Sequence, residues 1–339
     1  MFARHSPVAH SAYHDLLASL RDEAVAEIRG TPTRVERKGR AYWYDTYRVG
    51  SDVKKTYIGE DSDALRERMR RIEALRKDRE NRRRNRARLI RILRAEGFLG
   101  IDAATGSLLN AMASAGVFRL GGTVAGTQAF RLYEGELGVR FAFDHTAQTN
   151  DIDIASFERL SIALEDTVSE PLESVLQDFA FESVPSLDAG KIWRWKQTRN
   201  EALVEFLTPS FTEAEDLRPL PALGVHAQSL HYLNYLLAEP ILAAVTYRDG
   251  VLVQIPRPER FAIHKIIVAD RRGDGADSLK AVKDRLQAEY LVKVLAEDRP
   301  DDLREAVEDA LSRGKRWRER LIASIAKVSS LRSALDPFL

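Results

Sequence analysis

The sequence of 339 residues contains no cysteine, which excludes disulfides, thiol nucleophiles and thiolate-bound zinc. It also lacks any apolar run near the ~20 residues needed to cross a bilayer, and its first residues lack the apolar stretch of a secretory signal. These absences predict a cytoplasmic protein without a membrane partner. Carboxylates and the seven histidines remain as metal ligands, a set that favours hard, oxygen-bound cations.

An overall excess of either charge is missing too, since the net charge is only +1. Residues 66–94 nevertheless hold 14 Arg and Lys against four acids, so this segment carries +10 and the rest of the chain −9. Such asymmetry predicts a basic arm that faces a polyanion. Phosphate contacts with an RNA acceptor are assigned to Arg82, Arg83, Arg84 and Arg86. A solvated helix face with i,i+4 ion pairs, or an oligomer contact, explains the run equally well.

Hydrophobic periodicity divides the chain into four predicted parts. They are an N-terminal helix and small β-meander (1–60), a basic helical arm (61–99), a mixed α/β domain (100–256) and a C-terminal helical domain (257–339). Within the third part the pattern predicts helices at 105–115, from 123 and at 226–237, strands at 117–121, 138–143, 150–154, 191–197, 201–208, 241–247 and 251–255, and a loop at 209–222.

The segment at 151–154, DIDI, alternates as a half-buried strand does. Residues two apart point to the same face, so Asp151 and Asp153 present neighbouring carboxylates while the isoleucines enter the core. Paired carboxylates invite a divalent cation, and oxygen ligation favours Mg²⁺ or Mn²⁺. Glu205, in an apolar strand, is a third acid that would complete a cage for two ions ~3.5–4 Å apart, as in phosphoryl transfer. These three acids are the candidate catalytic and metal-binding residues.

A glycine pair precedes these acids. Gly121 and Gly122 are expected to end a strand and Thr123 to open a helix, whose free N–H groups can bind a phosphate. Each feature alone has an ordinary structural explanation, because paired glycines usually form a tight turn and acids on strands are usually solvated. A strand, a glycine turn, a helix, the DIDI strand and an acid-bearing strand in this order are more specific.

In that order the residues resemble the DNA polymerase β superfamily of nucleotidyltransferases. The likeness is greatest to a bacterial branch near the minimal and toxin-type nucleotidyltransferases of phage defence, and it covers roughly residues 100–300. It implies an α/β (α+β) nucleotidyltransferase-fold mixed sheet with flanking helices. Two departures from the pattern are a long gap between Gly122 and Asp151, which implies an inserted segment, and Glu rather than Asp as the third acid.

The resemblance also implies nucleotide-binding roles. Gly121, Gly122 and Thr123 match the turn that holds the triphosphate, while Lys265 and Asp284 look like a downstream Lys and Asp near the nucleotide. Arg272 is seven residues after Lys265 on the same helical face, and Lys283 adjoins Asp284, so both are included. Lys265 and Arg272 are expected on a helix over 258–272, and Lys283 and Asp284 on the next helix, over 277–295. This next helix is expected to bury residues 279, 282, 286 and 290. That leaves Lys283 and Asp284 near the exposed side, where Asp284 could orient Lys265.

Together these residues predict a metal-dependent enzyme that transfers a nucleoside monophosphate from a nucleoside triphosphate to a hydroxyl of an RNA, tRNA or protein acceptor and releases pyrophosphate. The alternative is a protein of the same fold that has lost turnover and holds nucleic acid or a partner protein with its basic arm. A DNA-binding regulator has less support, because the arm has no helix-turn-helix pattern. The base, the acceptor and the oligomeric state stay open.

Overall fold

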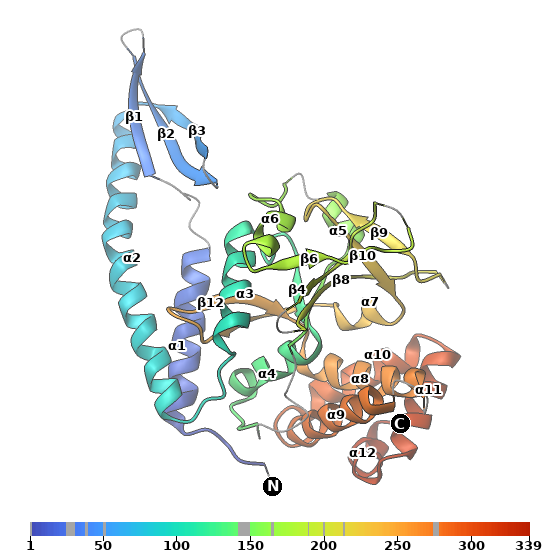
Figure 1. Ribbon diagram of the computed structural model, residues 1–339. Coiled ribbons are helices and arrows are strands. Elements are labelled where there is room, and N and C mark those ends of the chain that lie inside the picture. Colours follow the sequence, from blue (N-terminus) through green and yellow to red (C-terminus); the bar gives the residue numbers. More distant parts are fainter. Residues whose placement is uncertain are drawn as a thin grey trace.

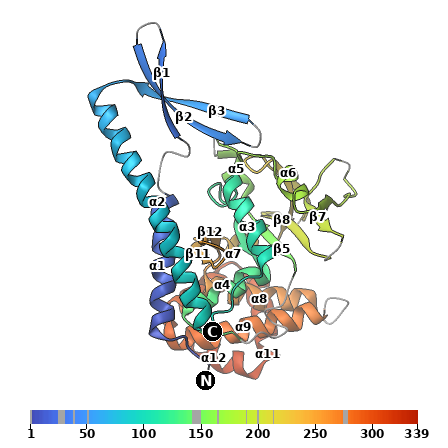
Figure 2. The ribbon, with the colours of Figure 1, turned by 60° about the vertical axis from the view of Figure 1, so that its left-hand side comes forward.

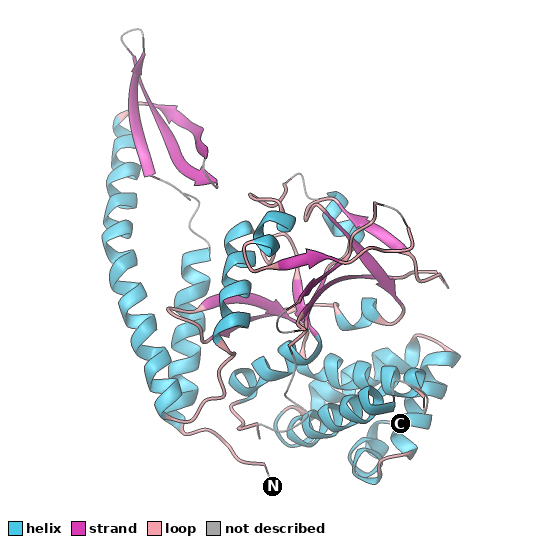
Figure 3. Cartoon of the chain, viewed as in Figure 1, coloured by secondary structure: helices cyan, strands magenta, loops and turns pink. Residues whose placement is uncertain are grey.

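The computed structural model describes residues 2–24, 31–37, 40–49, 52–141, 150–163, 166–188, 190–198, 201–212, 214–273 and 278–339 (Figure 1). Helices flank a mixed central sheet, and two smaller antiparallel sheets are not hydrogen-bonded to it (Figure 3). The predicted α/β class is therefore confirmed. None of the helices in these ranges is both long enough and apolar enough to cross a membrane.

The elements follow one another along the whole chain. The helices are α1 (Pro7–Ala24), α2 (Asp63–Ala95), α3 (Ala103–Ala115), α4 (Gly126–Leu137), α5 (Glu158–Ala163), α6 (Leu172–Gln177), α7 (Leu233–Leu236), α8 (Pro258–Arg272), α9 (Ser278–Asp298), α10 (Pro300–Ser312), α11 (Lys315–Ala326) and α12 (Ser329–Leu335). The strands are β1 (Thr31–Arg37), β2 (Arg40–Val49), β3 (Asp52–Glu60), β4 (Thr123–Ala125), β5 (Ile152–Ala155), β6 (Phe181–Ser183), β7 (Arg194–Gln197), β8 (Leu203–Pro209), β9 (Leu217–Leu220), β10 (Val225–Leu230), β11 (Ile241–Val245) and β12 (Val251–Ile255).

The N-terminal helix, the β-meander and the basic helix are present as predicted. Ser62 caps α2, because its side chain accepts a hydrogen bond from the Leu65 N–H and so satisfies one free donor of the first turn. The meander β1-β2-β3 lies at that N-terminal end of α2 (Figures 1 and 2). The C-terminal half of α2 buries Ile90 and Leu93 in a cluster with Leu16 and Leu20 of α1, which fixes the direction of the long helix.

Arg86 anchors α2 to the body and is only 2% exposed. Its guanidinium lies 2.6 Å from the Glu23 carboxylate, and its Nε donates to the Asp249 carbonyl at 3.0 Å, in the turn between β11 and β12. The prediction that Arg86 contacts RNA is therefore wrong. A guanidinium that is buried and bonded to protein oxygens is out of reach of a phosphate on another molecule.

The central sheet has the strand order β4-β5-β8-β10-β9, and β7 pairs with both β8 and β6. Both β5 and β10 run parallel to β8, whereas β4, β7 and β9 are antiparallel to their neighbours. The strands expected at 150–154, 191–197 and 201–208 correspond to β5, β7 and β8, and they join one sheet as predicted. The hairpin β11-β12, also predicted, packs against α1, α3 and β4.

The strand and helix boundaries around the glycine pair are wrong. Residues 117–121 form turns rather than a strand, the strand is β4 at 123–125, and α4 begins at Gly126. The mistake has a physical cause, since Val117 and Leu120 are buried in the core although they do not pair in a sheet. A short apolar run is equally compatible with a buried turn and a strand. Of the strand expected at 138–143, the described residues form only a bridge between Val139 and Arg4.

The helix expected at 226–237 is also wrong. The segment forms β10, in which burial alternates along the strand, followed by the short α7. Its neighbours β8 and β9 both supply backbone hydrogen-bond partners, and this tertiary pairing outweighs the local helical pattern. The loop expected at 209–222 contains β9, and α5, α6 and β6 were not anticipated.

The C-terminal region is helical as predicted, and α8 begins with Pro258 at its first turn. The expected buried stripe of α9 is wrong, because Leu279, Val282 and Leu286 are 84%, 48% and 43% exposed. The buried side instead carries Ala281, Asp284, Gln287, Ala288 and Leu291. The sequence pattern did not reveal this side, because it counts only apolar residues as core and two of the buried residues, Asp284 and Gln287, are polar.

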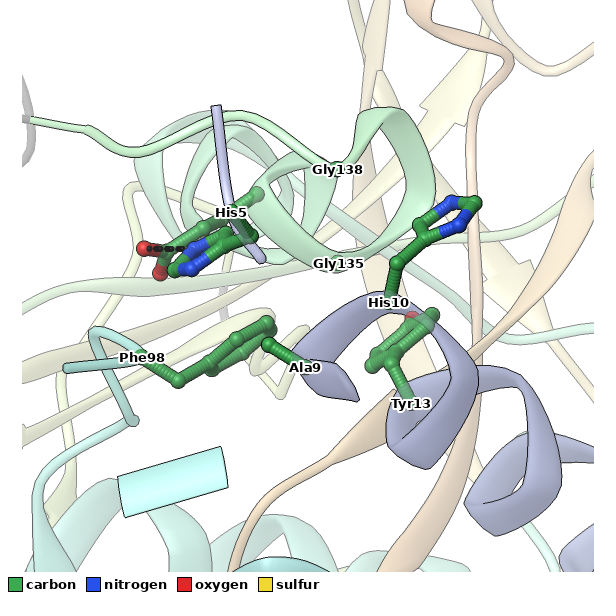
Figure 4. A pocket seen from close by; sticks show the side chains of 8 residues that line it. His5, Ala9, His10, Tyr13, Phe98, Gly135 and Gly138 are labelled. Atoms are coloured by element: carbon green, nitrogen blue, oxygen red, sulfur yellow. Dashed lines mark hydrogen bonds and ion pairs between the residues drawn. The ribbon is translucent and has the colours of Figure 1, made fainter. Parts of the chain in front are cut away.

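A small hollow marks where the N-terminal segment docks on α4 (Figure 4). His5 and Glu134 form a buried hydrogen bond of 2.9 Å there, and the His5 ring stacks on Phe98. Gly135 lies against the Tyr13 ring, where a Cβ atom would overlap it. The hollow has no room for a water molecule, so it is a packing contact rather than a ligand site.

We expect Arg86→Ala to lower the free energy of unfolding by roughly 2–4 kcal/mol, because it leaves the Asp249 carbonyl without the Arg86 donor and removes one of the two arginines, Arg79 and Arg86, that pair with Glu23. Urea unfolding measures this change. Arg84→Ala is the matched control, since Arg84 is 71% exposed and lies 3.8 Å from Glu80. Its effect should stay within about 0.5 kcal/mol. Equal, small effects of both substitutions would contradict the anchoring role of Arg86.

Candidate active site

One register row across the central sheet brings the predicted acids together. Asp153 of β5 is the direct partner of Glu205 on β8, and on its other side it pairs with Ala125 of β4. Directly paired residues have their side chains on the same face of a sheet. The parallel pairing of β5 with β8 thus places two carboxylates side by side, although 52 positions separate them in the numbering.

The opposite face of the same strands explains why the row is held in place. Ile152 and Ile154 of β5 pair with Val204 and Phe206 of β8, and all four side chains are buried. A shift of register by one residue would move these apolar side chains to the polar face, at the cost of their burial. Burial of the hydrophobic residues therefore fixes the position of the carboxylates.

The electrostatics of the row disfavour two negative charges. The pKa of Asp153 is raised, chiefly by burial and further by the negative charge of Asp151. The pKa of Glu205 is raised as well, by burial and by the charges of Asp153 and Asp151. Burial penalises the ionised form and like charges add to that penalty. Such a pair is stabilised by a cation.

Asp151 lies at the entrance of this group. Its side chain is exposed, and its Oδ1 accepts a hydrogen bond from the Leu203 N–H at 3.3 Å, which ties it to the start of β8. Among the residues described, no three acidic or histidine side chains lie close enough together to hold a single metal ion. The three carboxylates therefore do not form the predicted cage. Their mutual repulsion, and the hydrogen bond between Asp151 and Leu203, both favour this open arrangement. A hard divalent cation still fits the donor chemistry of Asp151 and Asp153.

The glycine next to the acids is Gly126, which the sequence reasoning missed. Gly126 has a φ of +60° at the first position of α4, and a Cβ atom there would overlap Oδ2 of Asp153. Only glycine lets the Asp153 carboxylate lie against the start of the helix. The missed signal was the third glycine of the segment LGGTVAGTQAF, four residues after the pair.

Gly121, Gly122 and Thr123 do not form the predicted turn before a helix. Gly121 has a φ of +89° and faces Leu160 of α5, and Gly122 fits closely against Val117. Thr123 is buried within β4, and its hydroxyl reaches back to the Gly121 carbonyl. The predicted turn before a helix is wrong, because these residues shape the packing before β4 and the helix N–H groups begin three residues later, while their binding of phosphate stays a prediction.

A group of cations from α8 and α9 faces the carboxylates. Lys265 Nζ lies 2.6 Å from Asp284 Oδ1, and Arg272 binds the other oxygen of the same carboxylate. Asp284 therefore orients Lys265 as predicted, but from the interior, since its side chain is 3% exposed rather than near the surface. The positive charges of Lys265 and Arg272 act on Asp153 and oppose the rise in its pKa.

Two further lysines belong to this group. Lys283 is half-buried, and its pKa is lowered by burial and by the nearby charge of Lys265, while Asp284, Asp151 and Asp153 oppose the shift. Lys280 acts on both Asp153 and Glu205. His264, in contrast, is neutral at physiological pH. Its burial, and next the positive charge of Lys265, lower its pKa to about 3. The cations of α8 and α9 oppose the rise in the pKa of Asp153 and Glu205 but do not cancel it.

Three exposed or partly exposed arginines of the arm, which lie outside this site, each have an acidic neighbour. Arg82 lies 3.5 Å from Asp78, Arg83 3.2 Å from Asp249 and Arg84 3.8 Å from Glu80. Exposed pairs of this kind contribute little to stability and are screened by salt. Contacts of Arg82, Arg83 and Arg84 with RNA stay a prediction.

Comparison with known proteins adds a family. Residues 103–312 match the family described as Nucleotidyltransferase, and residues 11–67 match a domain of unknown function. No curated protein matches the chain. Among solved structures, an antigenic nucleotidyltransferase-like protein from Paracoccidioides brasiliensis is similar over 70% of this chain and 94% of that one, with 14% sequence identity and a TM-score of 0.39. This similarity is too low to equate the two folds.

We expect Asp153→Asn to raise the free energy of unfolding at pH 7. The folded-state pKa of Asp153 is raised, so stability falls as the pH increases from the ordinary carboxyl pKa to the raised value. Above that window the wild-type chain carries the full penalty, which asparagine removes. The difference in the free energy of unfolding between the variant and the wild-type chain should become smaller as the pH is lowered towards the ordinary carboxyl pKa.

Urea unfolding of both chains over this pH range, without divalent cations, measures the effect. Asp301→Asn, at an 86% exposed side chain on α10, is the control and should give no comparable gain. If the Asp153→Asn variant were less stable than the wild-type chain at pH 7, the ionised Asp153 carboxylate would not be destabilising the folded state.

Proposed function

We propose that this chain, which belongs to the nucleotidyltransferase family, transfers a nucleoside monophosphate from a nucleoside triphosphate to an acceptor hydroxyl and releases pyrophosphate. The register row of Asp153 and Glu205, with Asp151 two residues away, is the observation that carries this proposal. The order of the helix-opening glycine turn, the DIDI strand and the acid-bearing strand also supports placing the chain in the DNA polymerase β superfamily, near its toxin-type branch.

The start of α4 and the cations of α8 and α9 suit a triphosphate. The first N–H groups of a helix have no partner within the helix and favour an anion, and α4 begins with Gly126 and Thr127 beside Asp153. In our proposal these groups bind the phosphates, while Lys265 and Arg272 neutralise the charge that develops on the leaving pyrophosphate. Asp284 holds both cations in position.

Asp151 and Asp153 are the residues that would hold Mg²⁺ or Mn²⁺. Their fit rests on hard oxygen donors and on the raised pKa of Asp153, which a bound cation would relieve. When bound, such an ion supplies charge neutralisation at the phosphate oxygens. In our proposal Glu205 is not a ligand of this ion, because no group of three ligands forms among the described residues. It is instead the proton acceptor.

The proposed reaction is a single displacement. The acceptor oxygen attacks the α-phosphorus, a new oxygen–phosphorus bond forms, and the bond to the pyrophosphate breaks. The acceptor proton passes to Glu205, whose raised pKa makes it a better proton acceptor than an ordinary carboxylate. Positioning and charge do the rest, so the chemistry requires no nucleophilic side chain.

We expect Asp153→Asn to lower the rate of transfer by about 10³-fold or more, since the loss of a cation ligand removes about 4 kcal/mol of transition-state stabilisation. Incubation with radiolabelled nucleoside triphosphates, Mg²⁺ and total RNA or cell extract measures the transfer. Asp301→Asn should keep wild-type activity. Near-normal turnover of Asp153→Asn would reject the site, and triphosphate binding without any label transfer by the wild-type chain would instead indicate a fold that has lost turnover.

Gly126→Ala should abolish most of the transfer, by about 10²-fold or more, because the new methyl group displaces the Asp153 carboxylate. Gly224→Ala is a matched control: Gly224 has a similar φ of +66°, but nothing lies within 4 Å of its added Cβ. Both variants bear the strain of a left-handed residue, about 1–2 kcal/mol. Steady-state rates of the two folded variants separate strain from displacement, and equal activity would argue against a role of Gly126 in the site.

A further inference from the structure

Arg194 extends the acidic row by one position. It is the direct partner of Glu205 on the side away from Asp153, so the row reads Ala125, Asp153, Glu205, Arg194 across four strands. The neighbouring Trp195 points to the opposite face, where it packs against Phe206 in the core. Arg194 therefore shares the face of the carboxylates, and its positive charge acts on Glu205.

Although Glu205 is its neighbour across the strands, no salt bridge joins the Arg194 guanidinium to a carboxylate in the described part of the chain. The guanidinium instead stacks on the indole of Trp193, whose ring centre is 5.2 Å from Cζ. A guanidinium carries five N–H donors in a planar fork that suits phosphate, and stacking on an aromatic ring leaves those donors available. Lys196, two residues further along the same face, is exposed and lies opposite the exposed Glu182 of β6, with no salt bridge between the two.

The basic residue Arg194 comes from a different element than the first group of cations. Lys265, Arg272 and Lys280 come from α8 and α9 and act on Asp153, whereas Arg194 comes from β7 and pairs directly with Glu205. If the α8 and α9 cations serve the triphosphate, the cations of β7 are left for the acceptor. This step rests on the proposed function.

We infer that Arg194, together with Lys196, binds the backbone phosphate next to the acceptor hydroxyl, so that the acceptor is the end of a nucleic-acid strand. A strand end brings a phosphate within one sugar of its hydroxyl, while a serine or tyrosine hydroxyl of a protein brings no anion of its own. The half-exposed Trp193 adds an aromatic ring on which the terminal base can stack. Alternating cations along a strand match an extended backbone better than a compact ligand.

The salt dependence of binding tests this inference without turnover. Anisotropy of a labelled single-stranded RNA, in EDTA and over a range of salt, gives the slope of log K against log salt. Arg194→Gln should weaken binding roughly fivefold and reduce the slope by about 0.7, the contribution of one phosphate contact on a single strand. Arg194→Lys should keep the slope. A DNA strand of the same sequence is the second arm: tighter RNA binding identifies RNA as the strand, and equal binding supports a strand of either kind.

Lys191→Gln is the charge-matched control, because Lys191 precedes the same strand but pairs with Asp188 at 3.1 Å outside the row. It should leave the slope unchanged. In transfer assays Arg194→Gln should raise KM for the strand and leave KM for the triphosphate as it is. An unchanged slope in Arg194→Gln, or label transferred to protein and not to nucleic acid, overturns the inference while the proposed function stands. A reduced slope without any transfer supports the strand surface and rejects the proposed reaction.

Discussion

The parallel pairing of β5 with β8 is the contact on which the site depends. Its core face buries Ile152, Ile154, Val204 and Phe206, and this burial sets the register. The other face then has no choice but to place Asp153 beside Glu205. A sheet transmits position well because its side chains alternate strictly, so a well-packed core face aligns the polar face with the same accuracy.

The arrangement costs electrostatic energy, and the surrounding elements offset it. Two half-buried carboxylates repel each other, and the cations of α8 and α9 face them across the site. Asp284 keeps Lys265 and Arg272 in place from the interior, so neither long side chain has to be ordered by substrate alone. Instability of this kind at an unliganded site is the usual counterpart of tight binding to a charged ligand.

The N-terminal half obeys a different rule, in which charge is used for structure. The arginine run looks like one basic surface in the sequence, yet Arg86 is buried between Glu23 and the β11-β12 turn, and its neighbours pair with acids of their own. A guanidinium can serve as an anchor or as a contact for phosphate, and only its surroundings decide which. The basic arm is therefore attached to the body by one of the residues that seemed to define its surface.

By itself, the sequence determined the elements whose period is regular: α1, the meander, α2, β5, β8, the β11-β12 hairpin and α8. It also determined that Asp153 and Glu205 belong to strands, because alternation is a local property, and that Asp151 adjoins the first of them. Tertiary structure alone decided the rest. Pairing with neighbouring strands makes residues 225–230 the strand β10. The face of α9 that contains Asp284 is buried, rather than the face predicted from the apolar residues. The glycine that the Asp153 carboxylate requires is Gly126, and not Gly121 or Gly122. A local pattern reports which residues are apolar, whereas a neighbour far away in the chain decides which polar residues become buried and which glycine must lack a side chain.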